Sequence, residues 1–343
     1  MKYTRTGIAA LAVIVIAATA LVLTSIGSAK PAQHKAAFKM AIVTDIGSLQ
    51  DRSFNQLANE GRKAIGKRLA IPTRVYETHA ASERIPNMLA ASKAGNKLVF
   101  GVGFLNYTAV NAVAPRFPKL QYAGIDQAYA LFENKPKNAT GVIFTEHEAG
   151  YLVGYLAALE MKKEGHDTIS AVGANNVPAI VRYISGYIQG AKKAYPGIKV
   201  LANYANDPTF SDQAKCHETA LNQINQGSHV VFQVAGGCGL GALQAAKENK
   251  VWGIGVDADQ RYLGAHIMTS ALKRVDKAVE DLTTLAAQGK LKTGGNYTFS
   301  LANGGVGLGS VSPKIPKDYV TKTVAIGKQI GEGKITVKPT VKF

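Results

Sequence analysis

The strongest constraint on the fold is an alternation of short β-branched runs and helical stretches that begins at Phe38. In the first half of the chain, runs such as KMAIVTD and KLVFGVG are each followed by a polar or glycine-containing loop and then by a stretch with helical periodicity. Residues 148–161 form one long predicted helix, and the alternation restarts at TISAVGA. Because such alternation produces parallel sheets with helices on both faces, the sequence predicts an α/β protein with two Rossmann-like lobes.

The restart after Met161 also predicts how the chain is divided between the lobes. A chain of 343 residues is long for one core, which supports two lobes. We expect the N-terminal lobe to contain residues 38–146 and about 276–302, and the C-terminal lobe to contain residues 147–275 and about 303–343. The chain would then cross between the lobes in a multi-strand hinge near residues 144–148, 273–276 and 301–305.

The first 29 residues have the pattern of an export signal. Lys2 and Arg5 precede an apolar run over residues 8–23, and the small residues Gly27, Ser28 and Ala29 follow it at the usual cleavage spacing. We expect a signal peptide over residues 1–29 that is cleaved after Ala29, although the run is also long enough for an uncleaved anchor. No cysteine stands near the end of this segment, so a lipidated amino-terminal cysteine is excluded. The pattern predicts export to the periplasm or to the outer face of the cell membrane.

The chain has only two cysteines, Cys216 and Cys238. In an exported protein an even number of cysteines predicts a disulfide. The seven histidines are scattered, and no Cys or His pair has the spacing of metal ligands, so we expect no metal site.

The net charge of +17 raises the question of nucleic-acid binding. The lysines and arginines are spread along the chain, without an arginine-rich tract or the mixture of aromatic and basic residues that lines strand-binding grooves. A basic exported protein is instead suited to an anionic membrane or cell wall. We therefore expect no nucleic-acid partner.

Polar residues and glycines recur where the predicted strands end. Ligands of open parallel sheets lie beyond the carboxyl ends of the strands. A single Asp at such a position is explained by helix capping or turn formation. Three carboxylates from both lobes together predict a site between the lobes for a ligand rich in hydroxyl and amine groups. The strand-end residues are Asp45, Gly101, Val102, Gly103, Asp126, Gly236, Gly237, Asp257 and Lys273.

The segment VAGGCGLGALQAA resembles a dinucleotide-binding fingerprint. Gly237, Gly239 and Ala242 fit G-x-G-x-x-G/A, and Asp257 lies twenty positions after Gly237. The alternative explanation is that these glycines allow backbone to approach backbone or a ligand. A diffusible nicotinamide cofactor is implausible in an exported protein, and the chain has no G-x-S-x-G, H-E-x-x-H or Walker motif. We expect a binding protein without cofactor or catalysis, and keep an NAD-dependent enzyme as the alternative.

Several ordered motifs resemble the basic membrane protein family, whose best understood type is a purine nucleoside receptor. The resemblance runs from about Phe38 to about Gly309 and rests on TDIGSLQDRSFNQLANEG, FPKLQYAGID, EHEAGYLVGYLAA, VFQVAGGCGLGALQAA, IGVDADQ and TSALKRVD. Members are substrate-binding proteins of ATP-driven importers with the type I periplasmic-binding-protein fold. The resemblance implies a monomer that binds a purine nucleoside such as adenosine, guanosine or inosine and delivers it to an ABC permease.

The resemblance also implies roles for four residues of the N-terminal lobe. Asp45 would form a hydrogen bond with the ligand, and Phe54 would stack on the purine. Asn55 would contact polar edges of the ring, and Asp126 would accept hydrogen bonds from ring nitrogens.

Four further residues of the C-terminal lobe complete the implied site. Phe210 would be the opposing aromatic residue, with Tyr204 as a substitute. Gly237 would bring backbone close to the ribose, while Asp257 and Lys273 would bind its hydroxyl groups. A bridge between Cys216 and Cys238 would tie the helix after TFSD to the glycine loop and stiffen one wall of the site.

Four alternatives stay open at this point. Ser53 and Gln56 fit a capping box, and Phe54 precedes Leu57 by three residues, so Phe54 could belong to the buried stripe of its helix. Lys273 could be a solvated lysine. The same fold could bind a sugar or another polar metabolite, or serve a sensor whose partner is a signalling protein.

Overall fold

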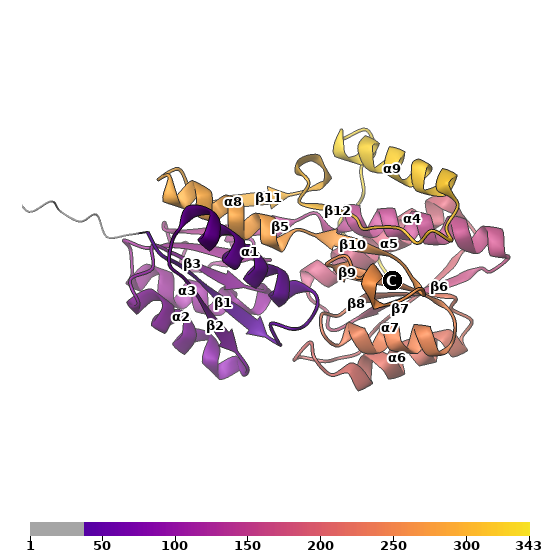
Figure 1. Ribbon diagram of the computed structural model, residues 1–343, viewed down its shortest axis with the longest axis horizontal. Helices are drawn as coiled ribbons and strands as arrows, with labels where there is room; N and C mark the ends of the chain where they lie inside the picture. Colours follow the sequence, from indigo (N-terminus) through magenta and orange to yellow (C-terminus); the bar gives the residue numbers. More distant parts are fainter. Residues whose placement is uncertain (1–37) are drawn as a thin grey trace, which may run out of the picture. The chain divides into compact units, whose positions relative to one another are not determined.

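Two six-stranded sheets organise residues 38–343, the part of the chain that the computed structural model describes (Figure 1). Their strand orders are β11-β5-β4-β3-β1-β2 and β12-β10-β9-β8-β6-β7. The expected signal peptide or anchor, residues 1–29, lies outside the described residues. Within residues 38–343 no helix combines the length and the apolar character that a membrane span requires.

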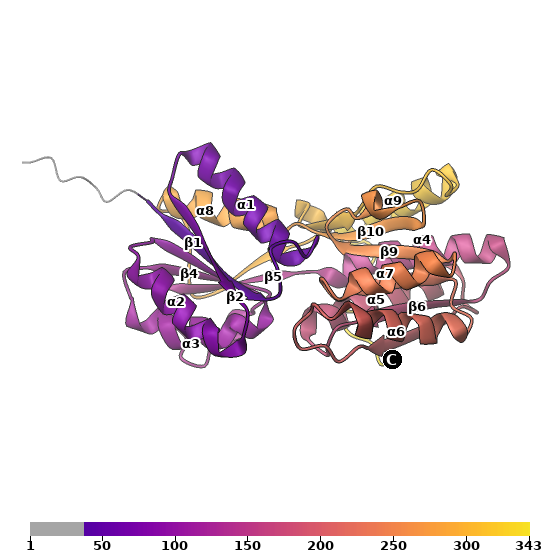
Figure 2. The ribbon, with the colours of Figure 1, turned by 60° about the horizontal axis from the view of Figure 1, so that its bottom comes forward.

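The first sheet is entirely parallel, and a pair of helices covers each of its faces. Helices α1 and α8 pack together on one face, and α2 and α3 on the other (Figure 2). We call this sheet and its helices the first lobe. Its strands are β1 (Met40–Ile46), β2 (Thr73–Thr78), β3 (Leu98–Val102), β4 (Gln121–Ile125), β5 (Ala139–Phe144) and β11 (Asn296–Phe299). Its helices are α1 (Phe54–Leu69), α2 (Arg84–Lys93), α3 (Tyr107–Val113) and α8 (Val275–Ala287).

The second lobe repeats this plan, with one antiparallel strand, β12, beside β10. Helices α4 and α5 cover one face of its sheet, α6 and α7 cover the other, and α9 packs on α4 (Figure 1). Its strands are β6 (Thr168–Gly173), β7 (Lys199–Tyr204), β8 (Val230–Val234), β9 (Trp252–Asp257), β10 (Ile267–Lys273) and β12 (Val306–Leu308). Its helices are α4 (Glu146–Glu164), α5 (Pro178–Ala194), α6 (Gln213–Asn225), α7 (Gly239–Glu248) and α9 (Lys317–Gly331).

The predicted fold class, two α/β lobes with parallel sheets, is confirmed. The burial of the central strands explains why they could be recognised in the sequence. All five residues of β3 and all five of β8 are buried, as expected for parallel strands that have helices on both faces and therefore form continuous apolar runs.

Three short segments carry the chain from one sheet to the other. The first joins β5 to α4, the second joins β10 to α8, and the third joins β11 to β12. We call them the crossing segments. Residues at their ends, such as Glu146 and Lys273, therefore lie where the two lobes meet.

Helices α4 and α5 touch through their backbones. Gly150 and Gly154 of α4 face carbonyl groups of α5, and Gly186 and Gly190 of α5 face carbonyl groups of α4. A methyl group at any of the four would overlap a carbonyl oxygen of the opposite helix. The contact fixes α4 against α5 in the second lobe.

We predict that Gly154→Ala lowers the free energy of unfolding by about 1–3 kcal/mol, because the new methyl group would collide with the rigid backbone at Tyr187. In an unconstrained helix the same change is stabilising by up to about 1 kcal/mol. Gly327→Ala in α9 is the matched control, since its methyl group would meet only the side-chain end of Leu152, at 3.3 Å. Urea unfolding of both variants checks the prediction, and equal effects of the two changes would contradict it.

Candidate functional site

A cavity lies where carboxyl ends of strands from both sheets face each other. The space between its lining residues, including space that is open to solvent, is about 770 Å³. The structure brings together all eight residues that the sequence analysis selected as ligand contacts. The eight are Asp45, Phe54, Asn55, Asp126, Phe210, Gly237, Asp257 and Lys273.

Asp51 positions Phe54 and Asn55 at the start of α1. Its carboxylate accepts hydrogen bonds from the backbone N–H groups of Ser53, Asn55 and Gln56, at 2.9, 2.8 and 3.1 Å. The alternative of a capping box is wrong, because the side chain of Ser53 makes no capping hydrogen bond. Asp51 itself lines the cavity. It was missed because a carboxylate two residues before a serine looks like an ordinary loop residue.

Phe54 belongs both to the cavity and to the core. The half-buried ring lines the cavity and also packs against the buried cluster of the lobes. The Nζ atom of Lys273 lies 5.1 Å from the centroid of the Phe54 ring.

The carbonyl oxygen of the Asn55 side chain is buried and has no hydrogen-bond partner within residues 38–343. An unpaired buried acceptor is costly, so a donor from a ligand would stabilise this wall.

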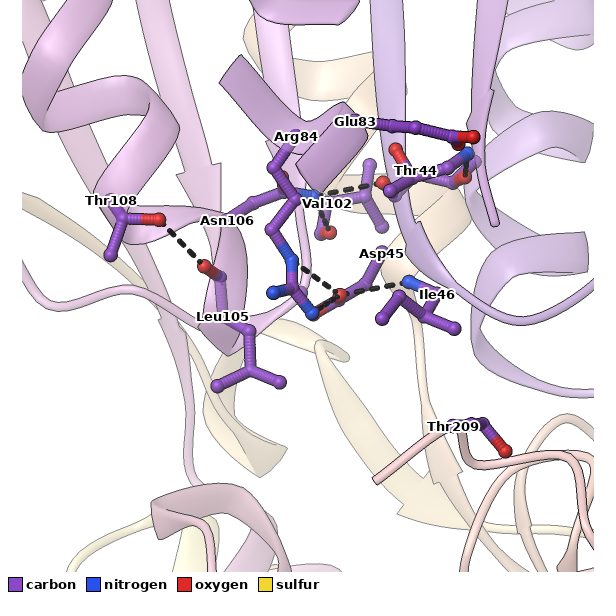
Figure 3. Close-up of polar contacts among 12 residues, drawn as sticks. Thr44, Asp45, Ile46, Glu83, Arg84, Val102, Leu105, Asn106, Thr108 and Thr209 are labelled. Atoms are coloured by element: carbon purple, nitrogen blue, oxygen red, sulfur yellow. Dashed lines mark hydrogen bonds and ion pairs between the residues drawn. The ribbon is translucent and has the colours of Figure 1, made fainter. Parts of the chain in front are cut away.

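Asp45 is held by an arginine that the sequence analysis did not select (Figure 3). Its Oδ1 atom accepts hydrogen bonds from Arg84, at 2.9 Å from Nη2 and 3.2 Å from Nε, and from the backbone N–H of Ile46, at 2.8 Å. Burial raises the pKa of Asp45, and the Arg84 guanidinium opposes this rise. A Cβ atom at Gly103, where φ is +95°, would lie 2.6 Å from the Asp45 side chain, so only glycine fits there.

Three cavity residues other than glycine have a left-handed backbone. The φ angles are +64° at Asp126, +56° at Phe210 and +61° at Asp257. Residues other than glycine seldom adopt this conformation, and such strain is concentrated at functional sites. In each case the backbone turns sharply after the end of a strand or within a loop and directs the side chain toward the cavity.

Lys273 lies at the centre of a buried charge cluster. Its Nζ atom is 2.6 Å from the Asp126 carboxylate and 2.9 Å from Oε1 of Glu146. Arg182 of α5 also pairs with Glu146. The alternative of a solvated lysine is wrong, because Lys273 is 1% exposed. Glu146 and Arg182 were missed because, in the sequence, an acid and a base near helix starts resemble ordinary surface charges.

The pKa values of the two carboxyl groups in this cluster are shifted in opposite directions. Burial raises the pKa of Asp126 to about 6, and the ammonium group of Lys273 opposes this rise without cancelling it. Burial also opposes ionisation of Glu146, but Lys273 and Arg182 together lower its pKa to about 2. Glu146 is therefore the permanent anion of the cluster, and Asp126 is the carboxyl group that can exchange a proton near neutral pH.

The second lobe supplies the opposite wall. Phe210 lines the cavity, whereas Tyr204, its proposed substitute, lies against Phe343 with ring centroids 6.3 Å apart. The disulfide between Cys216 and Cys238 is confirmed. The N–H of Cys238 donates to the carbonyl oxygen of Phe210 at 2.9 Å, so the bridge and this hydrogen bond together anchor the loop that carries the aromatic ring.

Asp257 is surrounded by protein donors. The hydroxyl of Ser53 donates to Oδ2 at 2.7 Å, and that of Tyr183 lies 3.3 Å from Oδ1. Burial is the main cause of the raised pKa of Asp257. Tyr183, which also lines the cavity, carried no signal in the sequence beyond its place on the apolar face of a helix.

Close packing explains the glycines of the apparent dinucleotide fingerprint. A Cβ atom at Gly239 would overlap the side chain of Gln233, and one at Gly241 would overlap the backbone of Gln213. Gly237 lies at the cavity, where a Cβ atom would stand 3.2 Å from the carbonyl oxygen of Phe210. Packing therefore explains Gly239, and the position of Gly237 beside the cavity is explained by its close approach to Phe210, so neither glycine requires a bound pyrophosphate.

Comparison with known proteins gives consistent results. A family model described as ABC transporter substrate-binding protein PnrA-like matches residues 38–340. The nucleoside-binding protein BmpA of a Lactococcus lactis ABC transporter is 34% identical, over 94% of this chain and 98% of that protein. A Pyrococcus horikoshii protein named as an uncharacterised lipoprotein is 32% identical, over 87% of this chain and 76% of that one. The structure of an ABC transporter solute-binding protein from Aeropyrum pernix is similar with a TM-score of 0.78 and 25% identity, over 87% of this chain and 92% of that one.

The raised pKa of Asp126 predicts a pH dependence of stability. Between pH 4 and 6 the folded protein retains a proton on Asp126 that the unfolded chain has released, so the free energy of unfolding should fall as the pH rises through this range. In Asp126→Asn this contribution, on the order of 2–3 kcal/mol, should be absent. Asn tolerates the left-handed backbone at this position.

Urea unfolding of both ligand-free proteins at pH 4, 5, 6 and 7 measures this difference. Asp45, Asp51 and Asp257, whose pKa values burial also raises, are present in both proteins and cancel in the comparison. Parallel pH profiles would show that Asp126 has an ordinary pKa.

Proposed function

This chain belongs to the PnrA-like family of ABC transporter substrate-binding proteins, as its motifs predicted, and from this premise we propose that it captures a purine nucleoside between its lobes. The family is described by substrate binding for transport, so we expect this chain to bind its solute without transforming it. The observation that carries the proposal is the combination of two aromatic rings, one from each lobe, with carboxylate and amide groups around the same cavity.

The aromatic pair favours a planar ring as ligand. Phe54 comes from the first lobe and Phe210 from the second, and both line the cavity. A purine between them would stack on both faces, with each contact worth about 1–3 kcal/mol. Because the two rings belong to different lobes, such a ligand would also favour the closed arrangement of the lobes.

The polar groups suit the rest of a nucleoside. Asn55 has a buried acceptor near Phe54 that finds no partner among residues 38–343, and Asp126 is a second acceptor for donors on the base. Asp257, Lys273 and the backbone at Gly237 line the cavity from the second lobe and would contact the ribose hydroxyls. A sugar would use the second group, but its puckered ring would stack less fully on the aromatic walls than a planar purine would.

The charges oppose a nucleotide. Four carboxylates, those of Asp45, Asp51, Asp126 and Asp257, line the cavity. Among the described lining residues Lys273 alone is basic, and Asp126 and Glu146 already neutralise its charge. A phosphate group would therefore meet net negative charge in a closed site.

The transport role follows from the family. An ABC substrate-binding protein delivers its solute to a membrane permease, and one relative of this chain is named as a lipoprotein. We place the protein outside the cytoplasmic membrane, in the periplasm or at the outer face of the cell membrane. It would act as a monomer, since both walls of the cavity come from one chain.

We predict that purified protein binds adenosine, guanosine or inosine more tightly than it binds the free bases or the corresponding nucleotides. Isothermal titration calorimetry against these compounds and a panel of sugars tests this. Heat of binding with sugars and none with nucleosides would instead identify the protein as a receptor for sugars.

Phe54→Ala should weaken nucleoside binding by about 1–3 kcal/mol, through loss of stacking on the base. Its effect on the ligand-free melting temperature should be smaller than that of Phe100→Ala, which removes a fully buried core side chain at a cost of about 3–5 kcal/mol. Calorimetry and thermal unfolding of both variants separate the two roles. Normal affinity with a strongly lowered melting temperature would make Phe54 a core residue only.

A further inference from the structure

Ser53 occupies a capping position but does not act as a helix cap. Asp51 accepts the backbone hydrogen bonds at the start of α1, and the side chain of Ser53 takes no part in them. Ser53 is nevertheless 0% exposed. A buried hydroxyl requires a partner, and this partner is not in its own lobe.

The hydroxyl of Ser53 reaches the second lobe. Its Oγ atom lies 2.7 Å from Oδ2 of Asp257 and 3.3 Å from the carbonyl oxygen of Val256. A serine has one proton to donate, and the shorter distance assigns it to the carboxylate. Hydrogen bonds to an ionised acceptor are about twice as strong as neutral ones.

A second hydrogen bond joins the lobes beside the first. Nε2 of Gln260 donates to the carbonyl oxygen of Arg52 at 3.1 Å. Gln260 is itself fixed in the second lobe by hydrogen bonds with Gln233, at 2.8 Å, and with the N–H of Val256, at 3.2 Å. Two consecutive residues of the first lobe thus meet the end of β9 and the loop after it.

This contact depends on closure of the lobes. It lies outside the crossing segments, so a hinge rotation that separates the lobes would break both hydrogen bonds and expose their groups to water. The contact therefore contributes to the closed state alone. An interaction of this kind lengthens the life of a closed complex and has little effect on the first encounter with a ligand.

We propose that Ser53 is a closure latch and a positioning residue for Asp257. In the closed protein its hydroxyl binds Oδ2, which fixes the carboxylate with Oδ1 near Tyr183 at the cavity. The latch slows ligand release and holds Asp257 in the orientation that meets the ligand. This rests on the proposed function only in that the ligand used to test it is a nucleoside.

The test is the dissociation rate of guanosine from the full chain. Ser53→Ala should raise this rate roughly tenfold, equivalent to about 1.4 kcal/mol, with the association rate changed by less than about twofold. Far-UV circular dichroism of the ligand-free protein should not change, because Asp51 still caps α1. Ser48→Ala is the matched control, since it removes a hydroxyl from the same loop whose hydrogen bonds stay within that loop.

A double-mutant cycle shows whether Ser53 acts through Asp257. In the Asp257→Asn background the effect of Ser53→Ala on dissociation should fall below about threefold, because contacting residues are not additive. A lowered ligand-free melting temperature with unchanged dissociation would overturn the latch and make Ser53 a structural residue. An equal effect of Ser53→Ala in both backgrounds would also overturn it.

Failure of the proposed nucleoside binding can be distinguished from failure of the proposed latch. If the wild-type protein binds neither guanosine nor any other nucleoside, the proposed function fails and the latch is judged without ligand. Small-angle X-ray scattering should then give a larger radius of gyration for Ser53→Ala than for Ser48→Ala. Equal radii in that case would overturn the latch.

Discussion

The buried ammonium group of Lys273 is the interaction on which the arrangement of the two lobes depends. It stands at the end of β10, immediately before a crossing segment, and contacts Asp126 from the first lobe and Glu146 at the start of α4. A buried charge is tolerated only when it is paired, and removal of one partner leaves a large desolvation penalty. The cluster therefore fixes two crossing segments and the end of β4 relative to one another, at the edge of the cavity.

The rest of the site is built outward from this cluster. Arg182 gives Glu146 a second cation, which leaves Asp126 as the carboxyl group with one partner. The same ammonium group lies 5.1 Å from the ring centroid of Phe54 and 4.9 Å from that of Phe144. Lys273 thus links the charged part of the cavity to its aromatic wall.

Much of this organisation could be predicted from the sequence, for a definite physical reason. Parallel strands end at the same edge of a sheet, so Asp45, Asp126 and Asp257 could be assigned to one region before their contacts were known. Apart from Asp51, the residues that were missed act through partners distant in the sequence. Arg84, Tyr183 and the hydroxyl of Ser53 each had an adequate local explanation, as a helix-start charge, an apolar face and a cap, and only the tertiary structure shows which carboxylate each one contacts.

The glycine contact between α4 and α5 limits how the affinity of this protein can evolve. Helices whose backbones touch cannot shift past each other by repacking side chains, because no side chains separate them. Sequence changes along this contact would damage the fold before they altered the cavity. Variation that tunes ligand affinity is thereby directed to cavity residues outside this glycine contact, where a substitution can change the cavity and leave the packing of α4 against α5 intact.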